Sequence, residues 1–109
     1  MPSDMDGDDI YGGRSQKAVG ARLALTRDVL GLKQGEFGER ADIKPSMYNQ
    51  IESGRSYPSV EAALRLCDTY RLTLDWIFRG EPSALEYGLA DAIHKAHEAR
   101  LRVVDGKKD

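Results

Sequence analysis

Apolar residues recur every three or four positions over most of the chain, which is the spacing of one face of an α-helix. This pattern predicts an all-α fold with five short helices between residues 15 and 81, at 15–30, 33–40, 45–53, from 59 onward and at 73–78. For three of these helices the spacing defines an inward-facing set. The sets are Val19, Leu23, Thr26 and Leu30 in the first helix, Val60, Ala63, Leu64 and Cys67 in the fourth, and Leu74, Trp76 and Ile77 in the fifth.

Glycine and proline residues mark the ends of these predicted helices. Gly31, Gly54 and Gly80 follow the first, third and fifth helices, and a glycine commonly ends a helix in this way. Pro45 suits the first position of the third helix because its φ is already fixed near the helical value. A tight turn around Asp42 therefore joins the second and third helices, and an aspartate tolerates the left-handed backbone conformation better than most residues.

A sixth helix is predicted at 84–103, after Pro82. Ser83 and Glu86 have the spacing of a capping box at its start. The five-helix core already closes at Gly80, so we expect the apolar stripe of this sixth helix to form a homodimer interface. Packing on its own domain and docking of another protein are the alternatives. The stripe is Leu85, Leu89, Ile93, Ala96 (or His97), Leu101 and Val104, and the interface residues expected within it are Leu85, Leu89, Ile93 and Leu101.

The two ends of the chain have little apolar sequence to bury. The first is rich in glycine and aspartate and is predicted to be a disordered acidic tail, and the last five residues are expected to fray. The four aspartates of the N-terminal tail are Asp4, Asp6, Asp8 and Asp9. The predicted organisation is therefore a tail at 1–14, a domain at 15–81, an amphipathic helix at 82–104 and a frayed end at 105–109.

Composition and charge exclude few function classes. The formal net charge is −2 and would be +2 without the four aspartates of the tail, so charge neither supports nor opposes nucleic-acid binding. The single cysteine, Cys67, cannot form an internal disulfide, which favours a reducing compartment such as the bacterial cytoplasm. The longest apolar runs are only a few residues, too short to span a membrane.

The second and third helices carry the most informative sequence. Gln34 opens the second helix, the string IKPSMYNQIESGR at 43–55 ends in the pattern Ile-Glu-x-Gly-Arg, and LTLDWIFRG closes the domain at 72–80. In these motifs residues 17–81 resemble the Cro/cI-type (xenobiotic-response-element-like) helix-turn-helix repressors of bacteria and phages. The resemblance implies a five-helix, lambda-repressor-like domain that binds double-stranded DNA. A homodimer would match a palindromic operator with half-sites about 34–36 Å apart.

The third helix is the expected recognition helix. Tyr48 and Ile51, three residues apart, would face inward, which leaves a small, uncharged face to enter the major groove. Gln50 is the strongest candidate for a base contact because its amide can pair with both N6 and N7 of adenine. The residues expected to contact bases are Pro45, Ser46, Met47, Asn49 and Gln50.

Contacts to the DNA backbone are expected from residues that flank this helix, and they would fix register rather than read sequence. These residues are Gln34, Lys44, Ser53, Arg55 and Tyr57. In the family, an arginine late in the first helix pairs with the glutamate that ends the recognition helix. Arg27 and Glu52 occupy the matching positions here, and the resemblance implies that they hold the recognition helix at a fixed angle.

The function that these features favour is a sequence-specific transcriptional regulator, and within that class a repressor. There are two alternatives. The first is an antitoxin or accessory subunit that binds DNA and also binds a partner protein through the C-terminal helix, and the second is a protein-interaction module that has lost DNA binding. The sequence has no nucleophile–base pair and no phosphate-binding loop, so we expect no enzymatic activity and no cofactor. The sixth helix mixes histidines and acids with basic residues on one element, which is not typical of a metal site. These residues are Asp91, His94, His97 and Glu98.

Overall fold

The computed structural model describes residues 9–108, with side chains through residue 102. All regular structure in this range is helical, as the apolar spacing predicts. The elements are α2 (Gln16–Val29), α3 (Gln34–Arg40), α4 (Pro45–Glu52), α5 (Val60–Tyr70), the short π-type helix η1 (Asp75–Arg79) and α6 (Tyr87–Lys108). No helix in the described part of the chain is long and apolar enough to cross a membrane.

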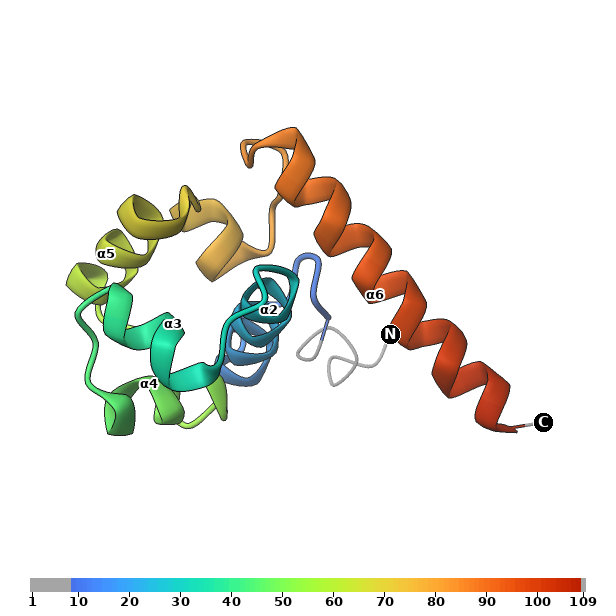
Figure 1. Ribbon diagram of the computed structural model, residues 1–109, viewed down its shortest axis with the longest axis horizontal. Helices are drawn as coiled ribbons and strands as arrows, with labels where there is room; N and C mark the ends of the chain where they lie inside the picture. Colours follow the sequence, from blue (N-terminus) through green and yellow to red (C-terminus); the bar gives the residue numbers. More distant parts are fainter. Residues whose placement is uncertain (1–8, 109) are drawn as a thin grey trace.

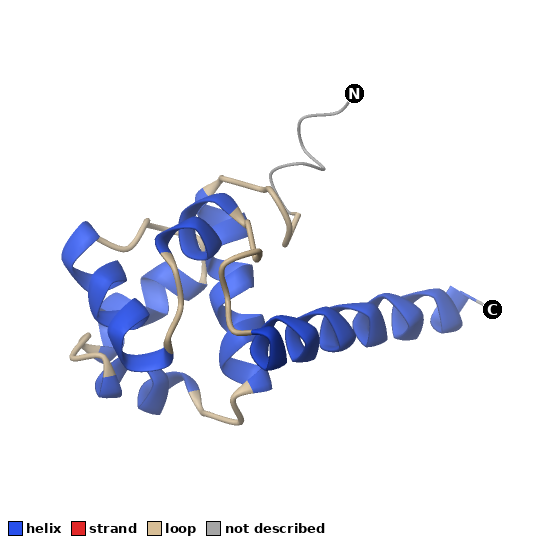
Figure 2. Cartoon of the chain, turned by 90° about the horizontal axis from the view of Figure 1, so that it is seen from above, coloured by secondary structure: helices blue, strands red, loops and turns tan. Residues whose placement is uncertain are grey.

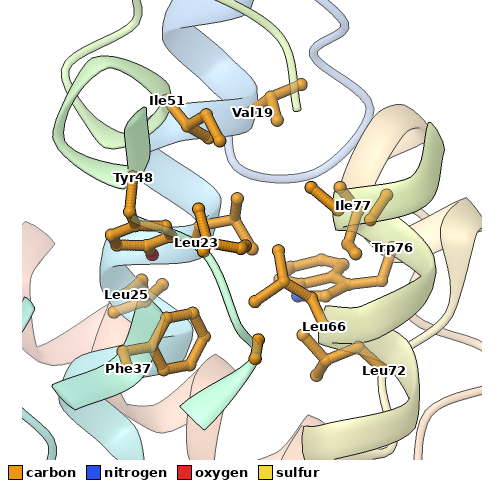
Figure 3. Close-up of a cluster of buried hydrophobic side chains, with 14 of the residues drawn as sticks. Val19, Leu23, Leu25, Phe37, Tyr48, Ile51, Leu66, Leu72, Trp76 and Ile77 are labelled. Atoms are coloured by element: carbon orange, nitrogen blue, oxygen red, sulfur yellow. The ribbon is translucent and has the colours of Figure 1, made fainter. Parts of the chain in front are cut away.

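Helix α2 lies at the centre of the fold, where it contacts α3, α4, η1 and α6 (Figure 1). Ser15 caps its N-terminus by accepting a hydrogen bond from the backbone N–H of Ala18. Its apolar residues meet those of the other helices in one core, shown in Figure 3. The core includes Val19, Leu23, Leu25, Phe37, Tyr48, Ile51, Leu66, Leu72, Trp76 and Ile77.

The backbones of α2 and α4 approach each other closely at Gly20. A Cβ atom added to Gly20 would lie 2.5 Å from the carbonyl oxygen of Glu52 and 2.6 Å from that of Ile51. Both neighbours are backbone atoms, which cannot move aside as a flexible side chain can. The absence of a side chain at Gly20 therefore sets how closely α4 packs against the central helix.

The inward face of α5 differs from the one predicted. Val60 is 67% exposed and Leu64 45% exposed, so assigning them to the core was wrong. Ala62 and Leu66 are buried in their place, and the predicted inward residues Ala63, Trp76 and Ile77 are buried as expected. Helix α5 starts as predicted, with Ser59 capping it through the N–H of Ala62, so the difference lies in which side of the helix packs on the core: that side carries Ala62, Ala63 and Leu66. Leu30 and Leu74, also predicted to face inward, are 38% and 39% exposed.

The segment before α2 is packed on the core, which corrects part of the predicted tail. Ile10 is buried, and the side chain of Arg22, also buried, donates hydrogen bonds to the carbonyl oxygens of Ile10 (2.7 Å) and Gly13 (2.6 Å). The N–H of Gly12 donates to the carbonyl oxygen of Gly80 at 3.2 Å. Residues 9–14 are therefore part of the folded domain, and the rest of the predicted tail, residues 1–8, lies outside the described residues.

Helix α6 begins later and ends later than the sequence predicts. The Ser83 side chain does not cap it: the backbone N–H of Ser83 donates to the Glu81 carboxylate at 3.2 Å, and the helix begins at Tyr87. The helix then continues through Lys108, beyond the predicted end at residue 103 and through most of the segment expected to fray. Asp109 lies outside the described residues.

The first half of α6 packs on its own domain, one of the alternatives to a homodimer interface that the sequence left open. Leu85 and Ile93 are buried within the chain, and Leu89 is half-buried against the core. Arg100 forms an ion pair with Asp28 of α2. Leu85 and Ile93 are thus covered within the chain, whereas Leu101 is 52% exposed; the C-terminal end of α6 extends away from the body (Figure 2).

Substitution of Gly20 tests the close contact between α2 and α4. We expect Gly20→Ala to lower the free energy of unfolding by about 1–3 kcal/mol, because the new methyl group clashes with backbone atoms of α4. Urea-induced unfolding followed by circular dichroism measures this loss. Gly35→Ala is the matched control, since a Cβ there meets nothing within 4 Å. That variant should be as stable as the wild type or more stable by up to about 1 kcal/mol, and an equal loss in both variants would contradict the account.

Candidate nucleic-acid interface

A tight turn fixes α3 against α4. Asp42 adopts a left-handed conformation with φ 59°, as the turn predicted around it requires. The N–H of Asp42 donates to the carbonyl oxygen of Glu39, and that of Ile43 to the carbonyl oxygen of Gly38, both at 2.9 Å. These bonds occupy the carbonyls of Gly38 and Glu39 in the last turn of α3. The chain therefore leaves α3 and enters α4 at Pro45 with one defined geometry.

The inner face of α4 is fully buried. Tyr48 is 1% exposed and Ile51 is completely covered, and both side chains point toward the α2 residues of the core (Figure 3). Gly38 of α3 also lies against Tyr48, where an added Cβ would come within 2.9 Å of the tyrosine Cβ. Helix α4 is therefore supported from behind by both α2 and α3.

The outer face of α4 is exposed and carries no charged side chain. All five residues predicted to contact bases lie on it or beside it: Pro45, Ser46, Met47, Asn49 and Gln50. Their side chains offer amides, a hydroxyl and apolar groups. A groove of about 480 Å³ runs along one side of this face, and Met47, Gln50 and Tyr57 contribute to its lining.

Arg27 and Glu52 form the ion pair that the resemblance implies. Arg27 Nε and Nη2 donate to the two carboxylate oxygens of Glu52, each at 2.9 Å, and Arg27 Nη1 donates to the carbonyl oxygen of Leu32, also at 2.9 Å. The Glu52 side chain is 7% exposed. Burial alone would raise the pKa of Glu52, but the hydrogen bonds from Arg27 and Gln34 outweigh it and lower the pKa below its ordinary value of 4.5. The pair is thus charged at neutral pH and ties the end of α4 to α2.

Gln34 lies differently from the outward orientation expected of a phosphate contact. Its Nε2 donates to Glu52 at 3.0 Å, and its Oε1 accepts a hydrogen bond from Asn49 Nδ2 at 3.1 Å. The Glu52 carboxylate is a strong, nearly buried acceptor, so it draws the amide of Gln34 toward α4. Gln34 therefore links the structural ion pair to Asn49, a residue of the exposed face, a link that the sequence analysis missed.

The other predicted backbone contacts fall into two groups. The Ser53 hydroxyl donates to the carbonyl oxygen of Gln50 at 3.1 Å, and the Tyr57 hydroxyl to the carbonyl oxygen of Arg14 at 2.7 Å. Their hydroxyl protons are therefore engaged within the chain. Lys44 and Arg55, at the two ends of α4, are exposed.

The comparison with known protein families agrees with a helix-turn-helix formed by α3 and α4. The sequence model of the helix-turn-helix domain family matches residues 18–83, which is more than half of the chain. The chain belongs to the helix-turn-helix domain family. In this helix-turn-helix domain, α3 and α4 are the two helices of the motif. Searches of curated proteins and of solved structures find no match.

The Arg27–Glu52 pair makes a pH-dependent contribution to stability. Because the folded-state pKa of Glu52 is lowered, its contribution is fully present above about pH 4.5 and is lost as the pH falls through the folded-state pKa. We expect Glu52→Gln to lower the unfolding free energy at pH 7 by about 1–3 kcal/mol, and the gap to the wild type to narrow below pH 4.5. Chemical unfolding between pH 3 and pH 8 measures the gap.

The control for this experiment is Glu39→Gln, which changes an exposed glutamate that makes no ion pair within the described residues. Its stability should follow that of the wild type across the same pH range. A gap between the wild type and Glu52→Gln that stays constant down to pH 3 would contradict a stabilising charge on Glu52.

Proposed function

We propose that this helix-turn-helix protein is a sequence-specific transcriptional regulator of the Cro/cI type that acts as a repressor in the bacterial cytoplasm. The observation that carries the proposal is the outer face of α4, which is exposed and uncharged while Tyr48 and Ile51 are buried behind it. An α-helix with its side chains is about 10–12 Å across, so a helix supported in this way fits the major groove, which is about 12 Å wide.

Base recognition in this proposal comes from polar and apolar contacts. Gln50 pairs with an adenine through its amide, and Ser46 donates or accepts a hydrogen bond at a neighbouring base edge. Pro45 and Met47 contact the methyl group of a thymine. Asn49 is held by Gln34 at 3.1 Å, so its amide approaches the bases with less freedom to rotate, which favours discrimination between them.

Backbone contacts in this proposal come from the flanks of α4. Lys44 precedes the helix and Arg55 follows it, and both are exposed cations that can meet phosphates on either side of the groove. Ser53 and Tyr57 keep an acceptor oxygen free but use their hydroxyl protons within the chain. They contribute less to phosphate binding than the two cations.

The exposed end of α6 supports a homodimer. The first half of α6 packs on its own domain, but Leu101 remains 52% exposed near the end of the described side chains. An amphipathic helix gains stability when its apolar side is covered, and a second copy of the same helix would cover it symmetrically. Such a dimer would bind a palindromic operator with half-sites about 34–36 Å apart.

Gln50 gives the sharpest test of base reading. Sites are first selected from random DNA with the full chain, and Gln50→Ala is then titrated on the selected duplex and on its single-base variants. We expect the variant to bind the selected site more weakly by about 1–3 kcal/mol and to lose discrimination at one base pair only. Binding to random DNA should stay unchanged. An equal loss on selected and random DNA would rule out base reading by Gln50.

Leu101 tests the proposed dimer. In sedimentation equilibrium the wild type should be dimeric at micromolar concentration, and Leu101→Lys should be monomeric because a charge replaces an apolar contact. Tyr87→Lys is the matched control, since Tyr87 is 83% exposed at the opposite end of α6; this variant should remain a dimer. A monomeric wild type would contradict the homodimer and favour α6 as a docking site for a different protein.

A further inference from the structure

The segment before α2 is held in place by a buried arginine that has no carboxylate partner in the described part of the chain. Arg22 is completely covered and donates to the carbonyl oxygens of Ile10, Gly13 and Ile77, the last at 3.3 Å. Burial lowers its pKa to about 10, so it is still charged at neutral pH. These bonds fix the path of residues 10–13 and therefore the position of Arg14, which follows.

Arg14 and Lys17 are brought to the end of α4 by two separate contacts. The Tyr57 hydroxyl, in the loop after α4, donates to the carbonyl oxygen of Arg14 at 2.7 Å. Gly54, the residue two beyond α4, approaches α2 so closely that a Cβ on it would lie 2.9 Å from Lys17 Cα. Arg55 is the next residue along the chain. The start of α2 and the residues before it therefore lie beside the loop that carries Arg55, beyond the C-terminal end of α4.

These three cations differ from most others in the protein. Arg14, Lys17 and Arg55 are all exposed, and none has an ion pair among residues 9–102. Most of the exposed cations on other surfaces lie within 4.0 Å of a carboxylate oxygen. Those paired cations are Arg40, Arg71, Arg79, Lys95 and Arg100. Unpaired cations on neighbouring segments of one surface attract an anion such as a phosphate.

We propose that Arg14, Lys17 and Arg55 form a phosphate-binding site that holds the DNA backbone at the C-terminal end of α4. The site rests on the proposed function, because it requires α4 to lie in the major groove. Helix α4 has eight residues at about 1.5 Å each and is about 12 Å long. Lys44 before its start and this cluster beyond its end are therefore far enough apart to meet phosphates at separate points along the groove.

The site adds affinity without adding sequence preference. Each phosphate that a cation neutralises releases counterions. Each such contact contributes about 0.9 to the magnitude of the slope of log affinity against log salt concentration. The cluster also gives the segment before α2 a role in binding. Its anchor, Arg22, is a positioning residue that acts through Arg14 without touching DNA itself.

The test is the double variant Arg14→Gln/Lys17→Gln, titrated by fluorescence anisotropy from 50 to 300 mM salt on a selected site and on random DNA. We expect the salt slope to fall by roughly 2 and affinity to fall by similar factors on both DNAs, with base preferences at the selected site unchanged. The matched control is Lys95→Gln/Arg102→Gln, which removes the same formal charge from exposed positions on α6. Its salt slope should stay close to that of the wild type.

The outcomes separate this site from the regulator proposal. If the wild type binds its selected site but both double variants lose the same affinity, the effect is one of net charge, and the phosphate site is overturned while the regulator stands. If the wild type has no salt-dependent affinity for any duplex, both proposals fail. Thermal unfolding of each variant verifies that the fold is retained, as the exposure of all four substituted residues predicts.

Discussion

The contact between α2 and the end of α4 is the constraint on which the rest of the structure depends. Gly20 lets the two backbones meet, and the paired hydrogen bonds between Arg27 and Glu52 hold them together at 2.9 Å. A bidentate arginine–carboxylate pair fixes direction as well as distance. Because Tyr48 and Ile51 are buried at the same junction, α4 cannot rotate about its axis, and its opposite face stays exposed to solvent.

The same ion pair joins the exposed face to more distant parts of the molecule. On one side, Glu52 accepts from Gln34, which in turn binds Asn49. On the other side, Arg27 lies 3.3 Å from Asp28, which pairs with Arg100 of α6. Polar networks of this kind hold their members in a common arrangement. Helix α6 is therefore connected to the recognition helix through α2, the helix that both of them contact.

The sequence predicted those features that depend on local chemistry. The left-handed turn at Asp42, the helix start at Pro45 and the buried residues Tyr48 and Ile51 follow from backbone preferences and apolar spacing, and the structure has all of them. The family resemblance added the Arg27–Glu52 pair, which no local pattern would predict. The coarse assignment as a helix-turn-helix domain was confirmed by the family match.

The features that the sequence did not predict depend on tertiary contacts. Apolar spacing placed Val60 and Leu64 inward. The neighbouring face of the same helix is also apolar, and only the tertiary packing shows that this second face, with Ala62 and Leu66, is the buried one. Arg22 has an ordinary charged side chain in the sequence, and its burial depends on the backbone carbonyls and the Trp76 ring that surround it. The orientation of Gln34 also depends on a tertiary contact, because its amide donates to the Glu52 carboxylate and does not point toward solvent.

The most direct measurement of the central claim is the change in backbone amide signals when duplex DNA is added to isotopically labelled protein. The largest changes should fall at residues 44–50, on the outer face of α4, with smaller ones at the loop that follows and none at residues 94–102 of α6. If DNA binds while the signals of α4 stay unchanged, the supported helix is not the surface that meets DNA, and the account is contradicted.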